Sequence, residues 1–482
     1  MSATLSNPPL DAGLVTRLRR MLGEEGLLTG EAALRVYECD GYTLEKARPA
    51  LVLLPATTQE VSRSVELLHK AGIAFVPRGA GTGVSGGCLP ADIPVMIGTS
   101  RMRRIRNVDL DNRRVEVEAG VVNLDVTRLV QGDGLHYAPD PSSQAACTIG
   151  GNVAENSGGP HTLKYGVTVN HLLGLELVLP DGEVLQLSRE AGSGGFDLAG
   201  VVTGSEGTLG IITSATLALV RTPQAVATML AVFPGVLEAS RAVSAIIAAG
   251  LVPAALEMMD ALVIKAVEAA YGFGFPADAG AVLIIELDGL AAALDEQCVQ
   301  VTEACNEQGA SEIRRADDPR ERELLWKSRK RAFGAMGRLA PSYCTQDGVV
   351  PRSALPEIVE RVGEIGRRYK LRIANLMHAG DGNIHPLLLY DENDPEQVTR
   401  VLDAGRDILL ACLELGGSVT GEHGIGIEKT DLMPASFGPA TLAAMADLRE
   451  VFNPRSLCNP HKILPSDRHC VEVTRPRPRG GG

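Results

Sequence analysis

Hydrophobic and polar positions alternate in short runs along the first half of the chain. Residues 50–77 contain an apolar run at 51–54, then apolar positions at helical spacing, then a second apolar run at 73–76. This pattern predicts a strand, a helix capped by Thr57 or Thr58, and a second strand. Short strands and turns continue to about residue 220, which indicates one β-rich domain.

The pattern changes near residues 221–223, where strands begin to alternate with longer helices. The expected elements are strands at 229–233, 281–287 and 312–315, a helix ending near 249 and a helix over 295–307. This order is typical of an α+β domain, with an antiparallel sheet and helices on one side. A last helix should end at Asn453-Pro454.

The expected fold class is therefore α+β, with three segments. Residues 1–222 (core about 46–222) form the first domain and 223–420 the second. Residues 421–482 form a small helical C-terminal segment that returns to the first domain. Its Arg-, Pro- and Gly-rich tail, 471–482, is expected to be disordered.

Composition and charge exclude several classes of protein. The 482 residues are 45% apolar and 22% charged, with a net charge of −13, which argues against nucleic acid as a partner. The best candidate for a membrane span, the fifteen uncharged residues 242–256, is too short to cross a bilayer, and no signal peptide is expected. A soluble cytoplasmic protein is expected, with membrane association only through a partner.

Nine cysteines without a C-x-x-C pair indicate free thiols and give no iron–sulfur motif.

The densest chemical signal is a loop with five glycines in nine residues, 79–87, directly after a predicted strand. Gly81, Gly83 and Gly86 match G-x-G-x-x-G, but no helix is expected next and Arg101 stands where an acidic residue is needed. The G-x-S-x-G pattern around Ser85 fails for the same reason. A flexible loop is the simple alternative. The glycine density instead favours a nest of backbone N–H groups that binds a pyrophosphate.

Two further segments have the same character. Residues 139–143 precede the glycine- and amide-rich segment 148–159, and residues 203–211 combine glycines with hydroxyl side chains. Such segments suit backbone contact with an extended ligand. Three in one domain indicate a nucleotide site.

A pair of histidines suggests a metal site. If Gly380-Asp381-Gly382-Asn383 forms a hairpin turn, His378 and His385 lie directly opposite each other, with Cβ atoms about 5 Å apart. Glu422-His423 follows between glycines, and two histidines with a carboxylate form a common open metal site. A nucleotide and a metal together suggest redox chemistry on a small chelating substrate.

These motifs resemble a known family. Pro-Arg-Gly-Ala-Gly-Thr-Gly, Pro-Asp-Pro-Ser-Ser, Gly-Gly-Asn-Val-Ala-Glu-Asn and Gly-Ser-Glu-Gly-Thr-Leu-Gly are similar to the PCMH-type FAD-binding domain of the vanillyl-alcohol-oxidase family. His-Ala-Gly-Asp-Gly-Asn-Ile-His and Gly-Glu-His-Gly-Ile-Gly resemble its D-2-hydroxyacid dehydrogenase branch. The resemblance covers about residues 40–465 and is most specific to the FAD-linked D subunits of bacterial glycolate oxidases, through segments that include 160–166, 256–260 and 347–351.

The resemblance implies a set of FAD-binding residues. The pyrophosphate would be held by Arg78, Gly79, Ala80, Gly81, Thr82, Gly83, Ser85 and Gly86. The flavin would be lined by Pro139, Asp140, Ser142, Ser143, Gly150, Gly151 and Asn152. The rest of the cofactor would lie near Gly204, Glu206, Gly207, Ile211 and Asn459. No histidine occurs from 78 to 87, so non-covalent FAD is expected.

The resemblance also implies catalytic roles. His378, His385 and Glu422 would bind a divalent metal, zinc or manganese, and His423 would be the base. Arg329 would pair with the substrate carboxylate; its alternative is a charge that faces solvent. His161 and His171 stay undecided, and three other histidines receive no role: His69, His136 and His461.

Two positions bear on the substrate. Relatives that act on hydroxyglutarate carry a lysine at the position of Thr345 and an asparagine at that of Leu387. Their absence favours a small monocarboxylate such as glycolate or D-lactate.

The expected activity is FAD-dependent oxidation of a small 2-hydroxy acid to the 2-oxo acid, with hydride transfer to flavin N5 and metal-assisted deprotonation of the hydroxyl. Electrons would pass to quinone or to partners, a second flavin-type subunit and an iron–sulfur subunit. The alternatives are a self-sufficient D-lactate or D-2-hydroxyglutarate dehydrogenase and a non-catalytic flavoprotein scaffold.

Overall fold

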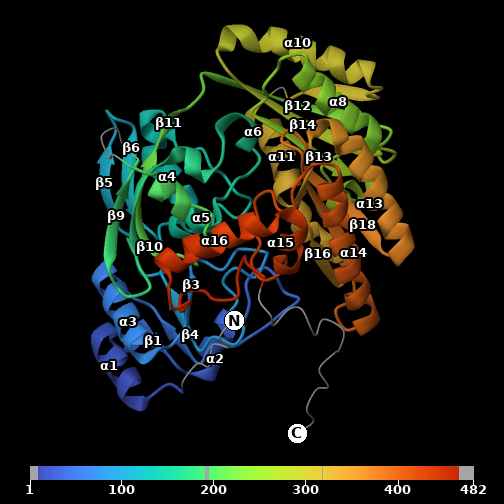
Figure 1. Ribbon diagram of the computed structural model, residues 1–482. Coiled ribbons are helices and arrows are strands. Elements are labelled where there is room, and N and C mark those ends of the chain that lie inside the picture. The colour runs from blue at the N-terminus through green and yellow to red at the C-terminus, as the bar shows by residue number, and fades with distance from the viewer. Residues whose placement is uncertain (1–8, 190–194, 317, 466–482) are drawn as a thin grey trace. The chain divides into compact units, whose positions relative to one another are not determined.

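The computed structural model describes residues 9–189, 195–316 and 318–465, which form two compact units (Figure 1). Unit 1 consists of the described parts of Met1–Gly158, Val167–Thr222 and Glu422–Gly482, and unit 2 of those of Gly159–Gly166 and Pro223–Gly421. The short segment Gly159–Gly166 therefore belongs to unit 2, although the sequence analysis placed it in the first domain. The tail 471–482 lies outside the described residues.

Unit 1 contains a four-stranded sheet in the order β1-β2-β4-β3. Its strands are β1 (Leu27–Leu28), β2 (Leu51–Leu53), β3 (Phe75–Arg78) and β4 (Val95–Gly98). The predicted strand–helix–strand unit is present, with α3 (Thr58–Ala71) between β2 and β3 and Thr57 as its N-cap. The later strand β4 lies between β2 and β3 and is parallel to both.

A second sheet of unit 1 is antiparallel, in the order β5-β6-β10-β8-β9. Its strands are β5 (Ile105–Asp109), β6 (Arg114–Glu118), β8 (Leu172–Val178), β9 (Val184–Ser188) and β10 (Ile211–Ala218). The short strands β7 (Leu135–His136) and β11 (Val220–Arg221) pair with each other. The remaining helices of unit 1 are α1 (Ala12–Leu22), α2 (Glu31–Leu34), α4 (Asn123–Val130), α5 (Ile149–Glu155), α7 (Leu198–Val202), α15 (Met433–Ser436) and α16 (Pro439–Phe452).

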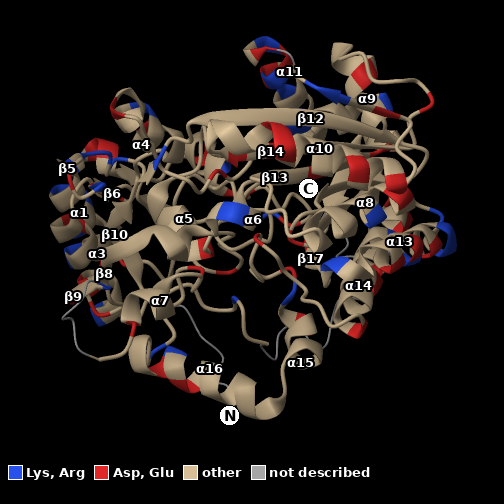
Figure 2. Cartoon of the chain, turned by 90° about the horizontal axis from the view of Figure 1, so that it is seen from above, with Lys and Arg blue, Asp and Glu red and all other residues tan. Residues whose placement is uncertain are grey.

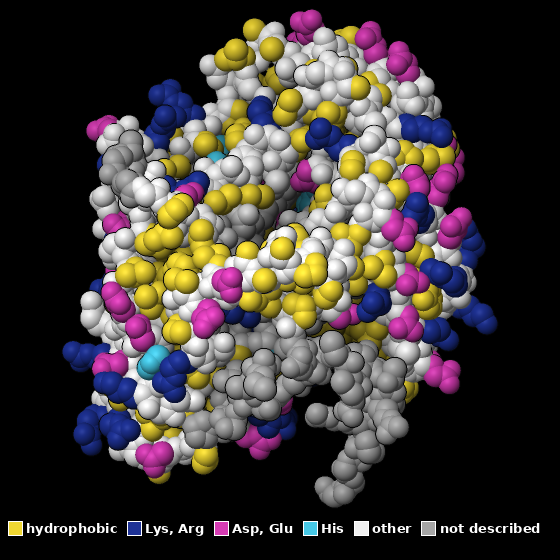
Figure 3. Space-filling model, viewed as in Figure 1, with side chains coloured by type: hydrophobic (Ala, Val, Ile, Leu, Met, Phe, Trp, Pro, Cys, Tyr) yellow, Lys and Arg dark blue, Asp and Glu magenta, His cyan; other side chains and the backbone are white. Residues whose placement is uncertain are grey.

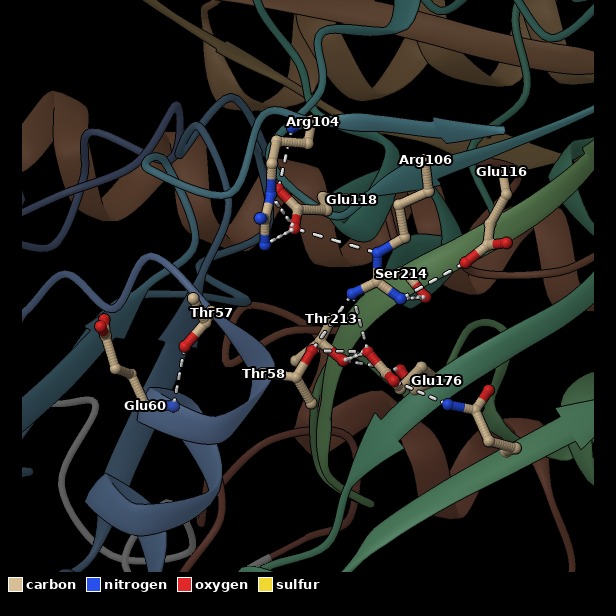
Figure 4. A network of polar contacts seen from close by, with 11 residues as sticks. Thr57, Thr58, Glu60, Arg104, Arg106, Glu116, Glu118, Glu176, Thr213 and Ser214 are labelled. Atoms are coloured by element: carbon tan, nitrogen blue, oxygen red, sulfur yellow. Dashed lines mark hydrogen bonds and ion pairs between the residues drawn. The ribbon is translucent and has the colours of Figure 1, made fainter. Parts of the chain in front are cut away.

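A buried polar network joins α3 to the antiparallel sheet (Figure 4). The Glu176 carboxylate accepts hydrogen bonds from Thr58 Oγ1 at 2.5 Å, Thr213 Oγ1 at 2.8 Å and Arg106 Nη2 at 3.1 Å. Burial would raise the pKa of Glu176, but these donors and the Arg106 charge hold it below its ordinary value. The network therefore keeps a charged carboxylate inside unit 1.

Unit 2 is built on one antiparallel sheet in the order β15-β12-β14-β13-β18-β19-β16, with β17 also paired to β19. The strands are β12 (Ala225–Phe233), β13 (Ala255–Asp260), β14 (Ala281–Gly289), β15 (Glu312–Arg315), β16 (Ser342–Thr345), β17 (Gly348–Val349), β18 (Arg372–His378) and β19 (Asn383–Tyr390). The predicted strand at 312–315 has the same bounds in the structure. The predicted strands at 229–233 and 281–287 are each shorter than the observed β12 and β14.

Helices cover both faces of this sheet, so the expectation of helices on one side is wrong. The helices of unit 2 are α6 (Thr162–Tyr165), α8 (Val236–Ala248), α9 (Ala261–Tyr271), α10 (Ala291–Glu307), α11 (Pro319–Lys330), α12 (Ala332–Ala335), α13 (Leu355–Tyr369) and α14 (Pro395–Glu414). Helices α9 and α11 pack in one core with Met259, Ile284 and Leu376, whereas α8 and α13 cover the opposite face (Figure 2). Because alternate residues of a strand face opposite sides, the central strands β12, β13 and β14 are largely apolar on both faces.

Three bulk properties can be compared with the structure. None of the described helices is long and apolar enough to cross a membrane. The eight cysteines within the described residues are all free thiols, as predicted. On the face shown in Figure 3, basic and acidic side chains are interspersed rather than gathered by sign.

Candidate functional site

The first glycine loop leaves β3 at Arg78 and runs without a helix to β4. Gly81 and Gly86 have φ angles of +72° and +76°, a left-handed conformation that favours glycine. At Gly83, an added Cβ would meet nothing within 4 Å. Packing within the protein therefore does not require this glycine, and the open space fits a ligand that approaches the backbone closely.

Two side chains predicted to bind the cofactor hold the protein itself in this structure. Arg78 Nη1 donates to Cys39 O at 2.9 Å, and the residue as a whole is only 8% exposed. Ser85 Oγ donates to His423 O at 2.8 Å. The Ser85 carbonyl also accepts from the N–H groups of Ile427 and Glu428. The first loop thus fixes the backbone of the segment that carries the predicted base.

The second predicted segment adjoins the first. An added Cβ at Gly79 would lie 2.6 Å from Thr148 Oγ1 and 3.6 Å from Gly151 Cα, so only glycine permits this approach. Asn123 Nδ2 donates to Pro139 O and to Asn152 Oδ1, each at 3.0 Å. Asn123 was missed by the sequence analysis. It joins the segment that contains Asp140, Ser142 and Ser143 to helix α5.

Gly150 has a packing role of its own, because an added Cβ would lie 2.6 Å from Ala119 Cβ. It therefore allows α5 to contact the chain just after β6. A glycine in a cofactor motif can thus be required by the fold alone.

The third segment is tied to the C-terminal part of unit 1. Glu206 has φ +50° and accepts from the N–H groups of Ile425 and Gly426, both at 2.7 Å. Asn459 Nδ2 donates to Glu206 O at 2.6 Å and to Gly87 O at 2.9 Å. Burial raises the pKa of Glu206, although the two amides oppose this rise.

Unit 1 therefore brings together the three glycine segments and Asn459. The other predicted residues of the third segment have structural environments. Gly204 and Gly207 have φ angles of +77° and +68°, and Ile211 is a core residue that is 2% exposed.

In unit 2, strands β18 and β19 form the predicted hairpin, but its register differs from the expectation. His378 pairs with Asn383, and Leu376 pairs with His385, so the two histidines are diagonal neighbours. The turn occupies residues 379–382, one position earlier than predicted, with Gly382 in the left-handed region at φ +84°. The prediction of directly opposed histidines was wrong. Both side chains still lie on the same face, because the shift is diagonal.

The two histidines are buried and close. They are 3% and 1% exposed, and their ring centroids are 5.1 Å apart at an interplanar angle of 89°. The Nδ1 atom of His378 lies 2.7 Å from Glu257 Oε1. A carboxylate accepts the Nδ1 proton, which leaves Nε2 as the atom that can bind a metal.

Asp347 adds a carboxylate that the sequence analysis did not assign. Its Oδ1 lies 4.0 Å from His385 Nδ1, and its Oδ2 accepts from Thr420 Oγ1 at 2.7 Å and from Gly421 N at 2.9 Å. Glu422 follows Gly421 directly, and consecutive Cα atoms are about 3.8 Å apart. An acidic residue between two sheet strands was the available signal in the sequence.

Arg329 is one of the most deeply buried charges of unit 2, at 2% exposure. Its Nε atom lies 2.6 Å from Glu257 Oε2, and Glu257 is 0% exposed. The alternative of a solvent-facing arginine is therefore wrong. Burial would raise the pKa of Glu257, but the Arg329 charge and His378 together hold it below its ordinary value.

Arg329 keeps free donor capacity beside this ion pair. Among the residues that the structure describes, none accepts a hydrogen bond from its buried Nη2 atom. A buried cation with an unused donor suits an anionic ligand.

Comparison with known proteins decides the family. Residues 49–188 match the FAD binding domain family, and residues 222–463 match the C-terminal domain of FAD linked oxidases. The chain belongs to the FAD-linked oxidases. This FAD-linked oxidase thus has its FAD-binding domain in the part of the chain where the first two glycine segments, 79–87 and 148–159, were found.

Similar curated proteins span nearly the whole FAD-linked oxidase. Glycolate oxidase subunit GlcD of Escherichia coli K12 is 45% identical over 437 residues, 90% of this chain and 88% of that protein. GlcD of Bacillus subtilis is 35% identical over 453 residues, covering 94% and 96%. D-lactate dehydrogenase of Anaerostipes hadrus is 32% identical over 428 residues, covering 87% and 90%.

Solved structures support the fold of this FAD-linked oxidase. p-Cresol methylhydroxylase with substrate bound has a TM-score of 0.79 at 17% identity, covering 94% of this chain and 96% of that one. Alkyldihydroxyacetonephosphate synthase has a TM-score of 0.75 at 20% identity, covering 95% and 87%. These likenesses concern the fold alone, which is the expected α+β fold with a PCMH-type FAD-binding domain.

Proposed function

We propose that this FAD-linked oxidase converts a small 2-hydroxy acid to the 2-oxo acid. The observation that carries the proposal is the buried chain Arg329–Glu257–His378, with His385 beside it. It joins a candidate carboxylate-binding cation to a candidate metal ligand within one unit. The similar proteins are named glycolate oxidase subunits and D-lactate dehydrogenase, whose substrates are 2-hydroxy acids.

The unit 1 residues named for the cofactor would hold FAD. These are Arg78, Gly79, Ala80, Gly81, Thr82, Gly83, Ser85, Gly86, Pro139, Asp140, Ser142, Ser143, Gly150, Gly151, Asn152, Gly204, Glu206, Gly207, Ile211 and Asn459. The open space at Gly83 fits this assignment. For Arg78, Ser85 and Glu206, whose side chains bind other parts of the protein, the role would be to shape the cradle. When bound, FAD supplies the hydride acceptor at N5.

The donor set of unit 2 fits a divalent cation such as zinc or manganese. His378 offers Nε2 because Glu257 engages Nδ1, and His385 is a second buried imidazole on the same sheet face. Glu422 would be the third ligand, since the chain reaches it one residue after Gly421 is held by Asp347. A divalent cation there supplies Lewis acidity that lowers the pKa of the substrate hydroxyl.

The residues themselves would divide the remaining work. Arg329 would bind the substrate carboxylate through its outer nitrogens, because Glu257 occupies the Nε side. His423 would take the hydroxyl proton, since imidazole titrates near neutral pH. Its backbone is held by Ser85, so the imidazole can be replaced without releasing the loop.

A small monocarboxylate, glycolate or D-lactate, is the proposed substrate. Thr345 and Leu387 pair across strands β16 and β19, and Leu387 lies two residues from His385 and is fully buried. Neither side chain offers a cation or an amide for a second carboxylate. Hydroxyglutarate is therefore the less suitable substrate.

Electrons must leave the reduced flavin. Since two of the similar proteins are named as subunits, a multi-subunit complex is proposed, with a second flavin-type subunit and an iron–sulfur subunit. The second candidate is a self-sufficient D-lactate dehydrogenase that reduces quinone, favoured by the similarity to D-lactate dehydrogenases. A non-catalytic scaffold is disfavoured by the buried histidine pair.

An anaerobic absorbance titration of the purified holoenzyme tests the proposal. Glycolate or D-lactate should bleach the flavin band, and prior treatment with a chelator should slow the bleaching. Bleaching that is insensitive to metal removal would contradict the metal-assisted step. A flavin band that neither acid bleaches would contradict the proposed substrate class.

A further inference from the structure

One buried carboxylate of unit 2 contacts two of the residues discussed above. Glu257, on β13, accepts from His378 of strand β18 through Oε1 and pairs with Arg329 of helix α11 through Oε2. The two distances are 2.7 Å and 2.6 Å, and the Glu257 side chain is 0% exposed. Water therefore does not compete for either oxygen.

We propose that Glu257 is a positioning residue that sets the metal ligand His378 and the anion-binding Arg329 relative to each other. The inference rests on the proposed function and adds a residue to it. Glu257 would touch neither substrate nor metal, and would act through its two neighbours.

The first half of this role concerns His378. A carboxylate that accepts the Nδ1 proton fixes both the tautomer and the ring orientation, and it makes Nε2 a stronger donor to a metal. Loss of such a partner typically weakens metal binding 10- to 100-fold. This strengthening of metal binding by His378 requires the negative charge of the Glu257 side chain as well as its shape.

The second half concerns Arg329. Guanidinium is a planar fork, so a partner on Nε fixes the direction in which the two outer nitrogens point. Those nitrogens can then bind a carboxylate with two parallel hydrogen bonds. Because both neighbours share one carboxylate, the distance between the metal ligand and the anion-binding fork is set by one side chain.

A simpler explanation is that Glu257 only anchors α11 to the sheet. The neighbouring strand offers a matched control, since Glu286 on β14 is 2% exposed and pairs with Ala255 of β13. Glu286 also holds α11, through Trp326 Nε1 at 2.5 Å and Arg322 Nε at 3.1 Å. The side-chain partners of Glu286 within the described residues are Thr228, Arg322, Trp326 and His161, none of which is a predicted metal ligand. Replacing Glu286 therefore perturbs the anchoring of the helix and leaves His378 in place.

The experiment compares wild-type holoenzyme with Glu257→Gln and Glu286→Gln. After metal removal, the dissociation constant for Zn²⁺ is measured by competition with a chromophoric chelator, together with flavin content and the KM for glycolate or D-lactate. Glu257→Gln should weaken Zn²⁺ binding about 10- to 100-fold and raise KM about 10-fold. Glu286→Gln should keep the wild-type Zn²⁺ affinity and lower the thermal midpoint instead.

Two outcomes would overturn the inference. One is a Glu257→Gln variant with wild-type Zn²⁺ affinity, and the other is equal weakening by both substitutions, which would mean that anchoring of α11 is the cause. Should Glu257→Gln fail to fold, Glu257→Asp is measured in its place, with partial weakening expected and wild-type affinity contradicting the role. A wild-type protein that binds no Zn²⁺ or Mn²⁺ would instead contradict the metal site of the proposed function.

Discussion

Single buried charges explain much of the arrangement of unit 2. Glu286 accepts hydrogen bonds from Thr228, Arg322 and Trp326, and lies 3.2 Å from His161 Nε2. The His161 ring also stacks on Trp326, with ring centroids 5.3 Å apart. One carboxylate thus joins segment 159–166 and helix α11 to the central strand. His161, whose role the sequence left undecided, therefore has at least a structural role.

Glu286 should make the free energy of unfolding depend on pH in the acid range. Burial would raise its pKa, but bonds from His161 and Arg322 lower it from 4.5 to about 2. A lowered folded-state pKa gives stability that is complete above pH 4.5 and is lost as pH falls toward 2. The shift corresponds to about 3 kcal/mol, so Glu286→Gln should lower the free energy of unfolding by that order at pH 7. Urea unfolding at pH 7 and pH 3 measures this, and a difference between wild type and variant that is unchanged at pH 3 would contradict it.

The proposed base gives a second prediction at this scale. His423→Gln should lower kcat by about 10²- to 10⁴-fold while flavin content stays the same, because only the proton acceptor is removed. His69→Gln is the control and should retain wild-type kcat, because His69 Nδ1 contacts Pro180 O and His69 has no proposed role in the site. Stopped-flow reduction of the flavin by substrate measures both. A His423→Gln enzyme with a wild-type rate would remove His423 from the mechanism.

At the scale of elements, the hairpin of β18 and β19 depends on its turn. Gly382 combines φ +84° with a close approach, since an added Cβ would lie 2.1 Å from Val350 O. This contact joins the turn to the segment after β17. The Gly380-Asp381-Gly382-Asn383 run in the sequence predicted the hairpin, but the position of the turn depends on that tertiary contact.

Gly382→Ala should therefore destabilise the hairpin and weaken metal binding. Gly416→Ala is the matched control, because Gly416 has φ +81° and an added Cβ meets nothing within 4 Å. Gly416→Ala should lower the free energy of unfolding only through backbone strain, on the order of 1 kcal/mol. Gly382→Ala should lower it clearly more. Thermal unfolding and Zn²⁺ affinity measure both variants. Equal effects in the two would show that the Val350 contact is unimportant.

At the scale of the whole molecule, the candidate cofactor residues and the histidine pair belong to different compact units. A ligand that binds only the folded state stabilises it, by about 2.7 kcal/mol at a hundredfold excess over its dissociation constant. Calorimetry of the full chain should show that added FAD raises mainly the transition of unit 1. Added Zn²⁺ should raise mainly that of unit 2, which supplies two of the three proposed ligands, His378 and His385. A single transition shifted equally by both ligands would contradict this assignment.

The sequence by itself predicted several of the elements and the family of the chain. Apolar periodicity predicted the strand–helix–strand unit around α3 and the change of pattern at 221–223, because local burial patterns follow strand and helix geometry. Glycine density predicted the three segments that unit 1 brings together. Motifs such as Gly-Glu-His-Gly-Ile-Gly identified the residues that the proposed mechanism uses.

Only the tertiary structure decided which partners these residues have. The sequence could not show that Glu257 holds His378 and Arg329, because residues far apart in the chain become neighbours only when β13, β18 and α11 pack together. It also could not fix the register of the hairpin or the assignment of segment 159–166 to unit 2. Each depends on contacts that are distant in sequence, and local propensity contains no information about them.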